Sequence, residues 1–224
     1  MKIGIVYTST TPELIELVER ELRKNVGNDA EFISFQDPSI LGETREAGYV
    51  TPAAAARLIG LFAKAVEQGA DVILNCCSSV GDVADSTQDM AKYTGTPIVR
   101  IDEEMCREAV RLGKRIGVMA TLPTTLDPTK NTIVRVAREM NRRVELVDAL
   151  LDGAFGLSQD EFKARMQQKA QEIAGKVDVI LFAQGSMAYC EEAIHDQCKK
   201  PVVSSPRFGA VAVKEALTSK GLTA

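Results

Sequence analysis

The sequence predicts an α/β protein made of two parallel-sheet halves, which are related by a pseudo-twofold and enclose a central cleft. Three observations support this fold class. Short apolar runs of strand length alternate with longer segments of helical periodicity, a pattern typical of parallel sheets that are covered by helices on both faces. The same order of segments occurs twice along the chain. The 224 residues, of which 45% are hydrophobic, are sufficient for two such halves.

In the first half, strands are expected at residues 2–7, 32–35, 71–75 and 97–101. Two helices have proline at the first helical position, where its missing N–H costs nothing: one begins at Pro12 and the other at Pro52. Gly69 is expected to end the second of these helices. The first half therefore has the alternating strand and helix order of a parallel sheet.

The second half repeats this order, with strands expected at 115–120, 144–147, 178–182 and 201–203, and helices near 128–140 and 159–174. Asp71-Val-Ile-Leu recurs as Asp178-Val-Ile-Leu, which is 107 residues later (178 minus 71). We therefore expect one half to comprise residues 1–102 and 206–224, with a returning C-terminal helix, and the other to comprise residues 103–205.

Composition excludes several classes of protein. The net charge of −4 and the absence of a basic run argue against a nucleic-acid partner. No apolar stretch approaches the roughly 20 residues that span a bilayer, and the N-terminus reads as a strand, so a soluble cytoplasmic protein is expected. Five cysteines with one histidine indicate neither a disulfide framework nor a zinc site. No metal or cofactor is expected, and a nucleotide is only a distant alternative because the glycine-rich motifs are missing.

Four of the predicted strand ends are expected to line the cleft, and three of the four have small polar residues. In open α/β sheets, ligands bind beyond the carboxyl ends of the strands, so these segments are the candidate ligand-binding loops. Hydroxyl and backbone N–H groups there suit a small carboxylate or amide rather than a polyphosphate. The four segments are Tyr7-Thr8-Ser9-Thr10, Asn75-Cys76-Cys77-Ser78-Ser79, Ala120-Thr121-Leu122-Pro123-Thr124-Thr125 and Ala183-Gln184-Gly185-Ser186.

These segments, in this order, resemble the aspartate/glutamate/hydantoin racemase superfamily. The resemblance covers nearly the whole chain and implies two Rossmann-like halves and cysteine chemistry without a cofactor. It implies that Cys77 removes or delivers a proton at the carbon α to a carboxylate or carbonyl. It also implies that the Tyr7-Thr8-Ser9 loop and a threonine of the Ala120–Thr125 loop bind a substrate carboxylate.

The sequence departs from the two-cysteine pattern of that superfamily. The offset of 107 residues aligns Cys77 with Gln184, whose amide is not a useful proton donor or acceptor near neutral pH. Cys190 lies six residues further on, within the predicted helix, and could replace the second thiol only if that helix starts late and turns it inward. Members of the superfamily with one catalytic cysteine catalyse decarboxylation or cis–trans isomerisation.

Three functions therefore remain open. The first is a racemase or epimerase of amino-acid metabolism, the second is a single-cysteine isomerase, lyase or decarboxylase, and the third is a non-catalytic small-carboxylate-binding protein. Each of these is compatible with a homo-oligomer. Cys77 and Gln184 are the candidate catalytic residues. The candidate substrate-binding residues are Tyr7, Thr8, Ser9, Asn75, Ser78, Ser79, Thr121, Thr124, Gly185 and Ser186.

The other cysteines and the single histidine have simpler interpretations. Cys76 should point away from Cys77, because side chains alternate along a strand. Cys106 and Cys198 are expected to be inert on helices, and His195 is expected on a helix surface. Substrate selectivity is expected to depend on loops at 37–48 and 148–156.

Overall fold

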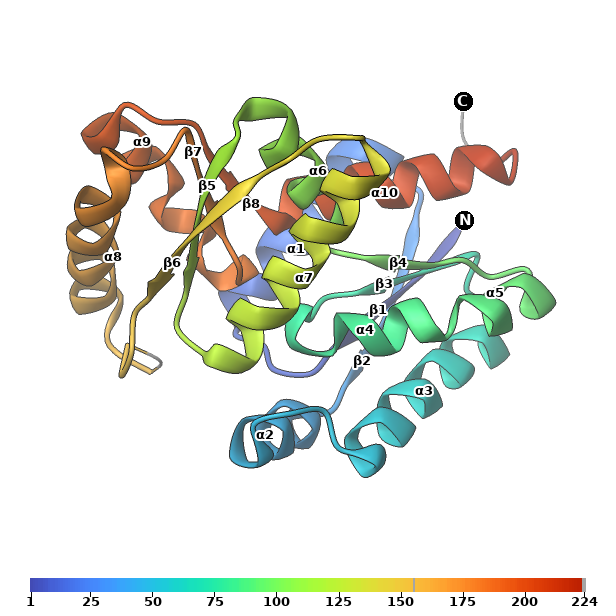
Figure 1. The fold of residues 1–224 in the computed structure, drawn as a ribbon. Helices are drawn as coiled ribbons and strands as arrows, with labels where there is room; N and C mark the ends of the chain where they lie inside the picture. The colour runs from blue at the N-terminus through green and yellow to red at the C-terminus, as the bar shows by residue number, and fades with distance from the viewer. Residues whose placement is uncertain (155, 223–224) are drawn as a thin grey trace. The chain divides into compact units, whose positions relative to one another are not determined.

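The computed structural model describes residues 1–154 and 156–222 and contains two four-stranded parallel sheets joined to helices (Figure 1). The chain divides into two compact units. Unit 1 comprises Met1–Ile101 and the described residues from Pro206 onward, and unit 2 comprises Asp102–Ser205. The predicted α/β class, with a parallel sheet in each half, is confirmed.

The sheet of unit 1 has the strand order β2-β1-β3-β4. Its strands are β1 (Lys2–Tyr7), β2 (Glu31–Gln36), β3 (Val72–Asn75) and β4 (Ile98–Arg100). Its helices are α1 (Pro12–Val26), α2 (Pro38–Ala47), α3 (Pro52–Glu67), the 3-10 helix η1 (Ser78–Val80), α4 (Gly81–Ser86), α5 (Gln88–Thr94) and α10 (Ser205–Ser219).

Alternation along the strands gives this sheet two buried faces. Ile3 and Ile5 of β1 pack in one core with residues of α1 and α10, such as Val18 and Val213. Val6 of the same strand packs in a second core, which α3, α4 and α5 complete. Figure 1 shows α3, α4 and α5 on one side of the sheet and α1 and α10 on the other. We call these sides the α3 face and the α1 face.

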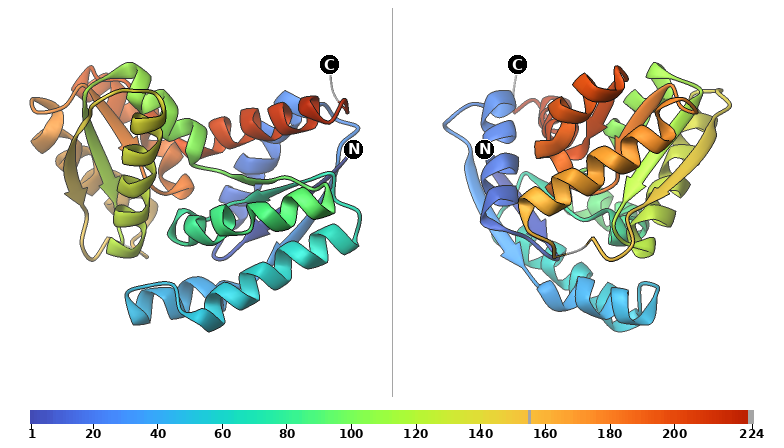
Figure 2. Two further views of the ribbon diagram at one scale, coloured as in Figure 1. Left: turned by 45° about the vertical axis from the view of Figure 1, so that its right-hand side comes forward. Right: turned by 90° about the vertical axis from the view of Figure 1, so that its left-hand side faces the viewer.

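Unit 2 has the equivalent strand order, β6-β5-β7-β8 (Figure 2). Its strands are β5 (Arg115–Ala120), β6 (Glu145–Leu150), β7 (Val179–Phe182) and β8 (Val202–Ser204). Its helices are α6 (Glu103–Leu112), α7 (Pro123–Glu139), α8 (Gln159–Ala174), the 3-10 helix η2 (Gly185–Cys190) and α9 (Glu191–Cys198). Helices α8 and α9 pack on each other and on the sheet, and α6 and α7 do the same.

The strand registers agree with an internal repeat. Ile3 pairs with Val72 in unit 1, and Ile116 pairs with Val179 in unit 2. The first strands of the two units therefore correspond with an offset of 113 residues (116 minus 3), and the third strands with an offset of 107 (179 minus 72). On this basis Thr8 corresponds to Thr121 and Cys77 to Gln184.

Two segments expected to be loops are helical. Residues 38–47 form α2, because Pro38 takes the first position, the Asp37 carboxylate accepts a hydrogen bond from Ser39 N–H, and Gly48 ends the helix with a left-handed φ of 79°. Helix α7 begins at Pro123 rather than at Pro128, which lies inside it. Thr124 therefore belongs to the first turn of a helix and not to a loop.

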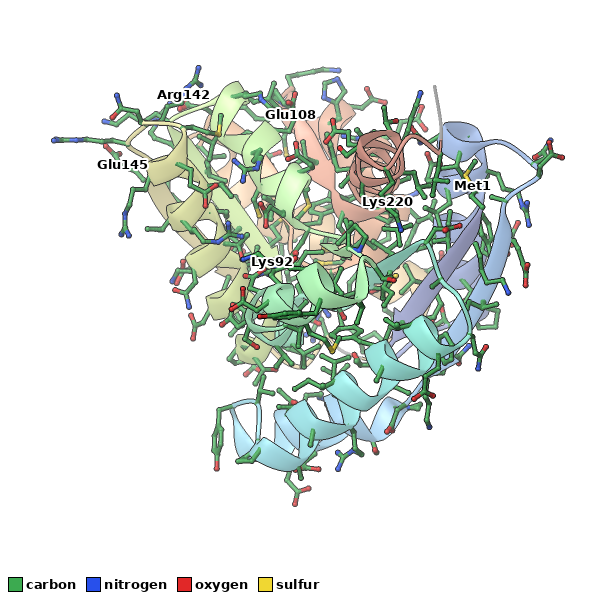
Figure 3. All side chains as sticks on the ribbon, turned by 90° about the vertical axis from the view of Figure 1, so that its right-hand side faces the viewer. Met1, Lys92, Glu108, Arg142, Glu145 and Lys220 are labelled. Carbon is green, nitrogen blue, oxygen red and sulfur yellow. The ribbon has the colours of Figure 1, made fainter. Side chains whose placement is uncertain are left out.

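An aspartate anchors the start of the third strand to the first in each unit. In unit 2, the Asp178 carboxylate accepts hydrogen bonds from the backbone N–H groups of Lys114 (3.1 Å) and Arg115 (2.8 Å). It also forms an ion pair of 2.6 Å with the Arg115 guanidinium. At the same end of the sheet, Lys114 pairs with Glu145, whose side chain is labelled in Figure 3. In unit 1, Asp71 accepts a hydrogen bond of 2.7 Å from Lys2 N–H.

These contacts predict a pH-dependent stability. The bonds and ion pair with Arg115 lower the pKa of Asp178 from 3.8 to about 2. A carboxyl whose folded pKa is depressed contributes stability above its unfolded pKa and loses it as pH falls towards the folded pKa. Asp178→Asn should therefore lower the free energy of unfolding at pH 6, and the difference from the wild type should shrink between about pH 4 and pH 2. Urea unfolding at several pH values measures this.

The exposed carboxylate of Asp29 provides the control for that measurement. Asp29→Asn should leave the free energy of unfolding nearly unchanged at every pH. A difference between wild type and Asp178→Asn that stays constant down to pH 2 would contradict the assigned role of Asp178.

No helix in the described residues combines the length and apolar character needed to cross a membrane.

Candidate active site

Cys77 lies at the carboxyl end of β3, directly before the 3-10 helix η1, with extended backbone angles (φ −135°, ψ 115°). Strand alternation separates it from its neighbour, as expected. Cys77 packs against the core of the α3 face, whereas Cys76 packs against the core of the α1 face. Burial raises the pKa of the Cys76 thiol, and the nearby Cys77 raises it further. Cys76 is therefore a structural thiol.

Asn75 precedes the two cysteines and shares the α3 face with Cys77, two residues away. Its side-chain Nδ2 donates a hydrogen bond of 3.1 Å to the backbone oxygen of Cys77. That bond fixes the amide orientation and leaves Oδ1 as the remaining acceptor. Asn75 is 1% exposed, and its Oδ1 is buried with no hydrogen-bond partner among the described residues.

Thr8 provides a second buried polar atom of this kind. It follows β1, in which Val6 pairs with Asn75, so alternation puts Thr8 on the same face as Val6. Thr8 is fully buried, and its hydroxyl has no hydrogen-bond partner in the part of the chain that the structure describes. A buried polar group without a partner typically costs about 1–3 kcal/mol. A ligand that bonds to the hydroxyl would remove this cost.

Tyr7 and Ser9 are placed differently from Thr8. Tyr7 is buried in the core of the α1 face, together with Cys76. Its burial, followed by the charges of Cys76 and Glu19, raises the pKa of its hydroxyl, so Tyr7 stays protonated. Ser9 is exposed. The structure therefore groups Thr8, but not Tyr7, with Cys77.

Ser78 and Ser79 begin η1 directly after Cys77, and both are buried. Helix α4 follows at Gly81 without an intervening loop. Residues 77–81, which we call the Cys77 turn, therefore form a compact connection between the end of β3 and the start of α4.

In unit 2, Gln184 and Thr121 bind each other. Gln184 Oε1 accepts a hydrogen bond of 2.8 Å from Thr121 N–H and lies 3.0 Å from the Thr121 hydroxyl. Gln184 Nε2 lies 2.9 Å from the same hydroxyl. Thr121, directly after β5, therefore provides two donors, its backbone N–H and its hydroxyl, and both lie within hydrogen-bond distance of the amide oxygen of Gln184. The corresponding position in unit 1 has the shorter side chain of Cys77 and the unsatisfied hydroxyl of Thr8.

The remaining candidates of unit 2 surround this pair. Gly185 and Ser186 begin η2, and Ser186 is exposed. Thr124 lies in the first turn of α7 and has a buried hydroxyl without a partner among the described residues.

Cys190, the candidate second thiol, is the last residue of η2 and is fully buried in the core of unit 2 with Met187 and Ile194. Burial raises the pKa of its thiol. A thiol in this position is a poor proton acceptor near neutral pH. Cys106 is buried on α6, and His195 is exposed on α9, as expected. No group of three or more His, Cys, Asp and Glu side chains within residues 1–154 and 156–222 is arranged to hold a metal ion.

Arg100 is a buried charged side chain near the Cys77 turn that sequence reasoning missed. It ends β4, pairs in register with Asn75 and is 3% exposed. The signal in the sequence is an arginine within an otherwise apolar strand, Pro97-Ile-Val-Arg-Ile101. A buried arginine requires a charged partner, which here is Asp85 of α4.

The chain is therefore an α/β protein of two repeated parallel-sheet units, with a thiol and buried polar groups without partners in the described residues at the strand ends. The family model of Asp/Glu/hydantoin racemases matches residues 3–213. The chain belongs to this enzyme family, as the resemblance implied. A sequence comparison with curated proteins gives no match.

Solved structures have the same fold at low sequence identity. Allantoin racemase from Klebsiella pneumoniae is 17% identical, with a TM-score of 0.67 over 100% of this chain and 89% of its own. Glutamate racemase from Bacillus anthracis is 14% identical, with a TM-score of 0.73 over 99% of this chain and 83% of its own. Unliganded arylmalonate decarboxylase is 18% identical, with a TM-score of 0.60 over 96% of this chain and 92% of its own.

Proposed function

We propose that this chain is a cofactor-independent enzyme that acts on the carbon α to a carboxylate or carbonyl of a small acid, with Cys77 as the base or nucleophile. One observation carries the proposal: Cys77 closely follows the buried strand β3, on the same sheet face as two buried polar atoms without partners in the described residues, Thr8 Oγ1 and Asn75 Oδ1. The family to which the chain belongs supports it. A cytoplasmic location and a role in amino-acid metabolism are parts of the same proposal.

The chemistry requires a thiolate and a stabilised enolate. The Cys77 thiolate takes the α-proton, and the electron pair of the broken C–H bond moves onto the carboxyl or carbonyl oxygen. Hydrogen-bond donors that are already in position stabilise this developing charge without reorganising. The Thr8 hydroxyl is such a donor, and Asn75 Oδ1 suits an N–H group of the substrate. Ser78 and Ser79, directly after Cys77, complete the proposed substrate-binding residues of unit 1.

Thr121, Thr124, Gly185 and Ser186 are proposed to contribute to substrate binding from unit 2. The Gln184 amide is not a useful general acid or base near neutral pH, and its bonds to Thr121 support a positioning role instead. We therefore propose that proton transfer by this chain depends on one thiol. This favours single-face chemistry over a two-thiol racemisation.

A single-cysteine isomerase, lyase or decarboxylase is the second candidate function. The Gln184 substitution favours it, and arylmalonate decarboxylase is among the structures of similar fold. A screen that contains D- and L-amino acids, hydantoins and substituted malonates distinguishes the candidates. Release of carbon dioxide from a malonate identifies a decarboxylase, and loss of optical rotation identifies a racemase. A non-catalytic carboxylate-binding protein would bind a member of this panel and turn over none.

Proton exchange in deuterated water tests the single-thiol version. If Cys77 works alone, the preferred enantiomer should exchange its α-proton, as followed by NMR, at least about tenfold faster than it racemises. Gln184→Cys should raise racemisation relative to exchange, because it restores a thiol at the position equivalent to Cys77. Gln184→Ser is the matched control, since it removes the same amide without adding a thiol. Equal rates of exchange and racemisation in the wild type would contradict the single-thiol version.

A further inference from the structure

A buried guanidinium lies between the end of β4 and the start of α4. Arg100 Nη1 is 2.7 Å from a carboxylate oxygen of Asp85 and 3.7 Å from one of Asp82. The Arg100 side chain is 2% exposed, whereas those of Asp85 and Asp82 are 36% and 66% exposed. The positive charge is therefore inside the unit, and its partners extend from it towards solvent.

The guanidinium also contacts the Cys77 turn directly. A Cβ atom added to Gly81 would overlap with Nη2 and Cζ of Arg100 and would lie 2.7 Å from Nε. Gly81 is not required here for its backbone conformation, because its φ is −60°. The absence of a side chain at Gly81 instead allows the turn to approach the guanidinium closely.

Strand register places the same arginine beside the candidate site. Arg100 pairs with Asn75 across β3 and β4, so the two side chains leave the same face of the sheet from adjacent strands, which are about 4.8 Å apart. Cys77 follows two residues after Asn75 on that face. Arg100 is thus the buried cation that is nearest in the sheet to the proposed thiolate among the described residues of unit 1.

Two other sets of charged groups on this side of unit 1 form ion pairs. Arg57 of α3 pairs with Glu43 of α2 at 2.6 Å and with Asp37 at 3.6 Å. Lys92 and Asp89 of α5 pair with each other at 2.8 Å, and both are largely exposed. Asp102, two residues after Arg100, is buried, and the thiol of Cys76 faces the opposite side of the sheet. All of these groups are unchanged in the variants described below.

We propose that Arg100 is a positioning residue for Cys77: its guanidinium holds the Cys77 turn, and its positive charge favours the thiolate that the proposed function requires. Asp85 holds the guanidinium in place and partly offsets its charge. The inference rests on the proposed function, which is the reason that a thiolate is needed. Its test is independent of that function, because the reactivity of a thiol is measured without a substrate.

Two substitutions break the same ion pair with opposite changes of charge. Arg100→Met removes a positive charge, and Asp85→Asn removes a negative one. The pH dependence of Cys77 alkylation by iodoacetamide in the full chain, resolved from Cys76 by tandem mass spectrometry, reports the thiol's ionisation. Arg100→Met should raise the pH midpoint by about one unit, and Asp85→Asn should lower it by a few tenths of a unit. A purely structural role would move both midpoints in the same direction, or neither.

Two further variants complete the test. Arg100→Lys keeps the charge but loses the planar fork, so its midpoint should stay near that of the wild type even if its Tm falls. Arg115→Met is the matched control, since it breaks an arginine–aspartate pair in unit 2 and should leave the Cys77 midpoint unchanged. If Arg100→Met does not fold, Asp85→Asn and Arg100→Lys decide the question by the same criteria. If the midpoints of Arg100→Met and Asp85→Asn shift in the same direction, or not at all, the role of Arg100 is overturned. The catalytic role of Cys77 is tested separately, by the activity of Cys77→Ser.

Discussion

Cys77→Ser should abolish turnover of the substrate identified by the panel, with a loss of at least about 10³-fold in kcat/KM. A serine hydroxyl is nearly isosteric with the thiol but far too weakly acidic to be ionised near neutral pH, so it cannot supply the base. The fold should be unaffected, because Cys77 is only partly buried. Steady-state kinetics and thermal unfolding of the purified variant measure both effects.

Cys76→Ser is the control that makes this result specific. Cys76 has the same side chain one residue away, but it packs against the core of the α1 face, on the opposite side of the sheet from Cys77. Its substitution should lower the Tm and leave kcat/KM within about threefold of the wild type. If Cys77→Ser keeps its activity while Cys76→Ser loses it, the catalytic residue has been assigned to the wrong cysteine.

Thr8→Val should weaken turnover by about 100-fold and at the same time stabilise the ligand-free protein by roughly 1 kcal/mol. Valine has nearly the shape of threonine, so packing is preserved. The substitution removes a buried hydroxyl that has no partner in the described structure, and with it the cost of burying that group. Stability and activity should therefore change in opposite directions. Urea unfolding and steady-state kinetics measure the two effects.

Thr96→Val is the matched control for Thr8→Val. Thr96 is also buried in unit 1 and outside the helices, but its hydroxyl donates a hydrogen bond of 3.1 Å to the backbone oxygen of Ala70. Its substitution should therefore cost roughly 1 kcal/mol of stability and leave kcat/KM unchanged. A loss of stability in Thr8→Val similar to that in Thr96→Val would show that the Thr8 hydroxyl is satisfied in the native protein.

The strand pattern could be predicted because it depends on local composition. Each buried parallel strand is a short apolar run, such as Val72–Asn75, and the helices at Pro12 and Pro52 begin with a capping threonine followed by proline. Helix α2 was missed because residues 38–47 have little apolar periodicity, which left Pro38 at the first position and the caps at Asp37 and Gly48 as its signals. The start of α7 was misplaced because two prolines compete for it, and only Pro123 stands at the first helical position.

The candidate site was predictable only as a set of strand ends. Alternation from β3 correctly separated Cys76 from Cys77. The sequence could not show that Gln184 binds Thr121, because that contact joins residues 63 positions apart through side-chain geometry. For the same reason it could not show that the Thr8 and Asn75 side chains are left with unsatisfied atoms, or that Arg100 lies against Gly81. Such contacts depend on packing, which residue type alone does not determine.

The pH profile of Cys77 alkylation in the wild-type protein is the direct test of whether this thiol is suited to proton transfer. Cys198 provides an internal reference in the same sample, because it is a partly buried thiol at the end of α9 whose pKa is raised by burial. We predict that Cys77 reacts with a midpoint at least one pH unit below that of Cys198, and that a substrate or competitive ligand from the panel protects it. A Cys77 midpoint at or above that of Cys198, with no protection by any ligand that binds, would contradict the account and favour a non-catalytic carboxylate-binding protein.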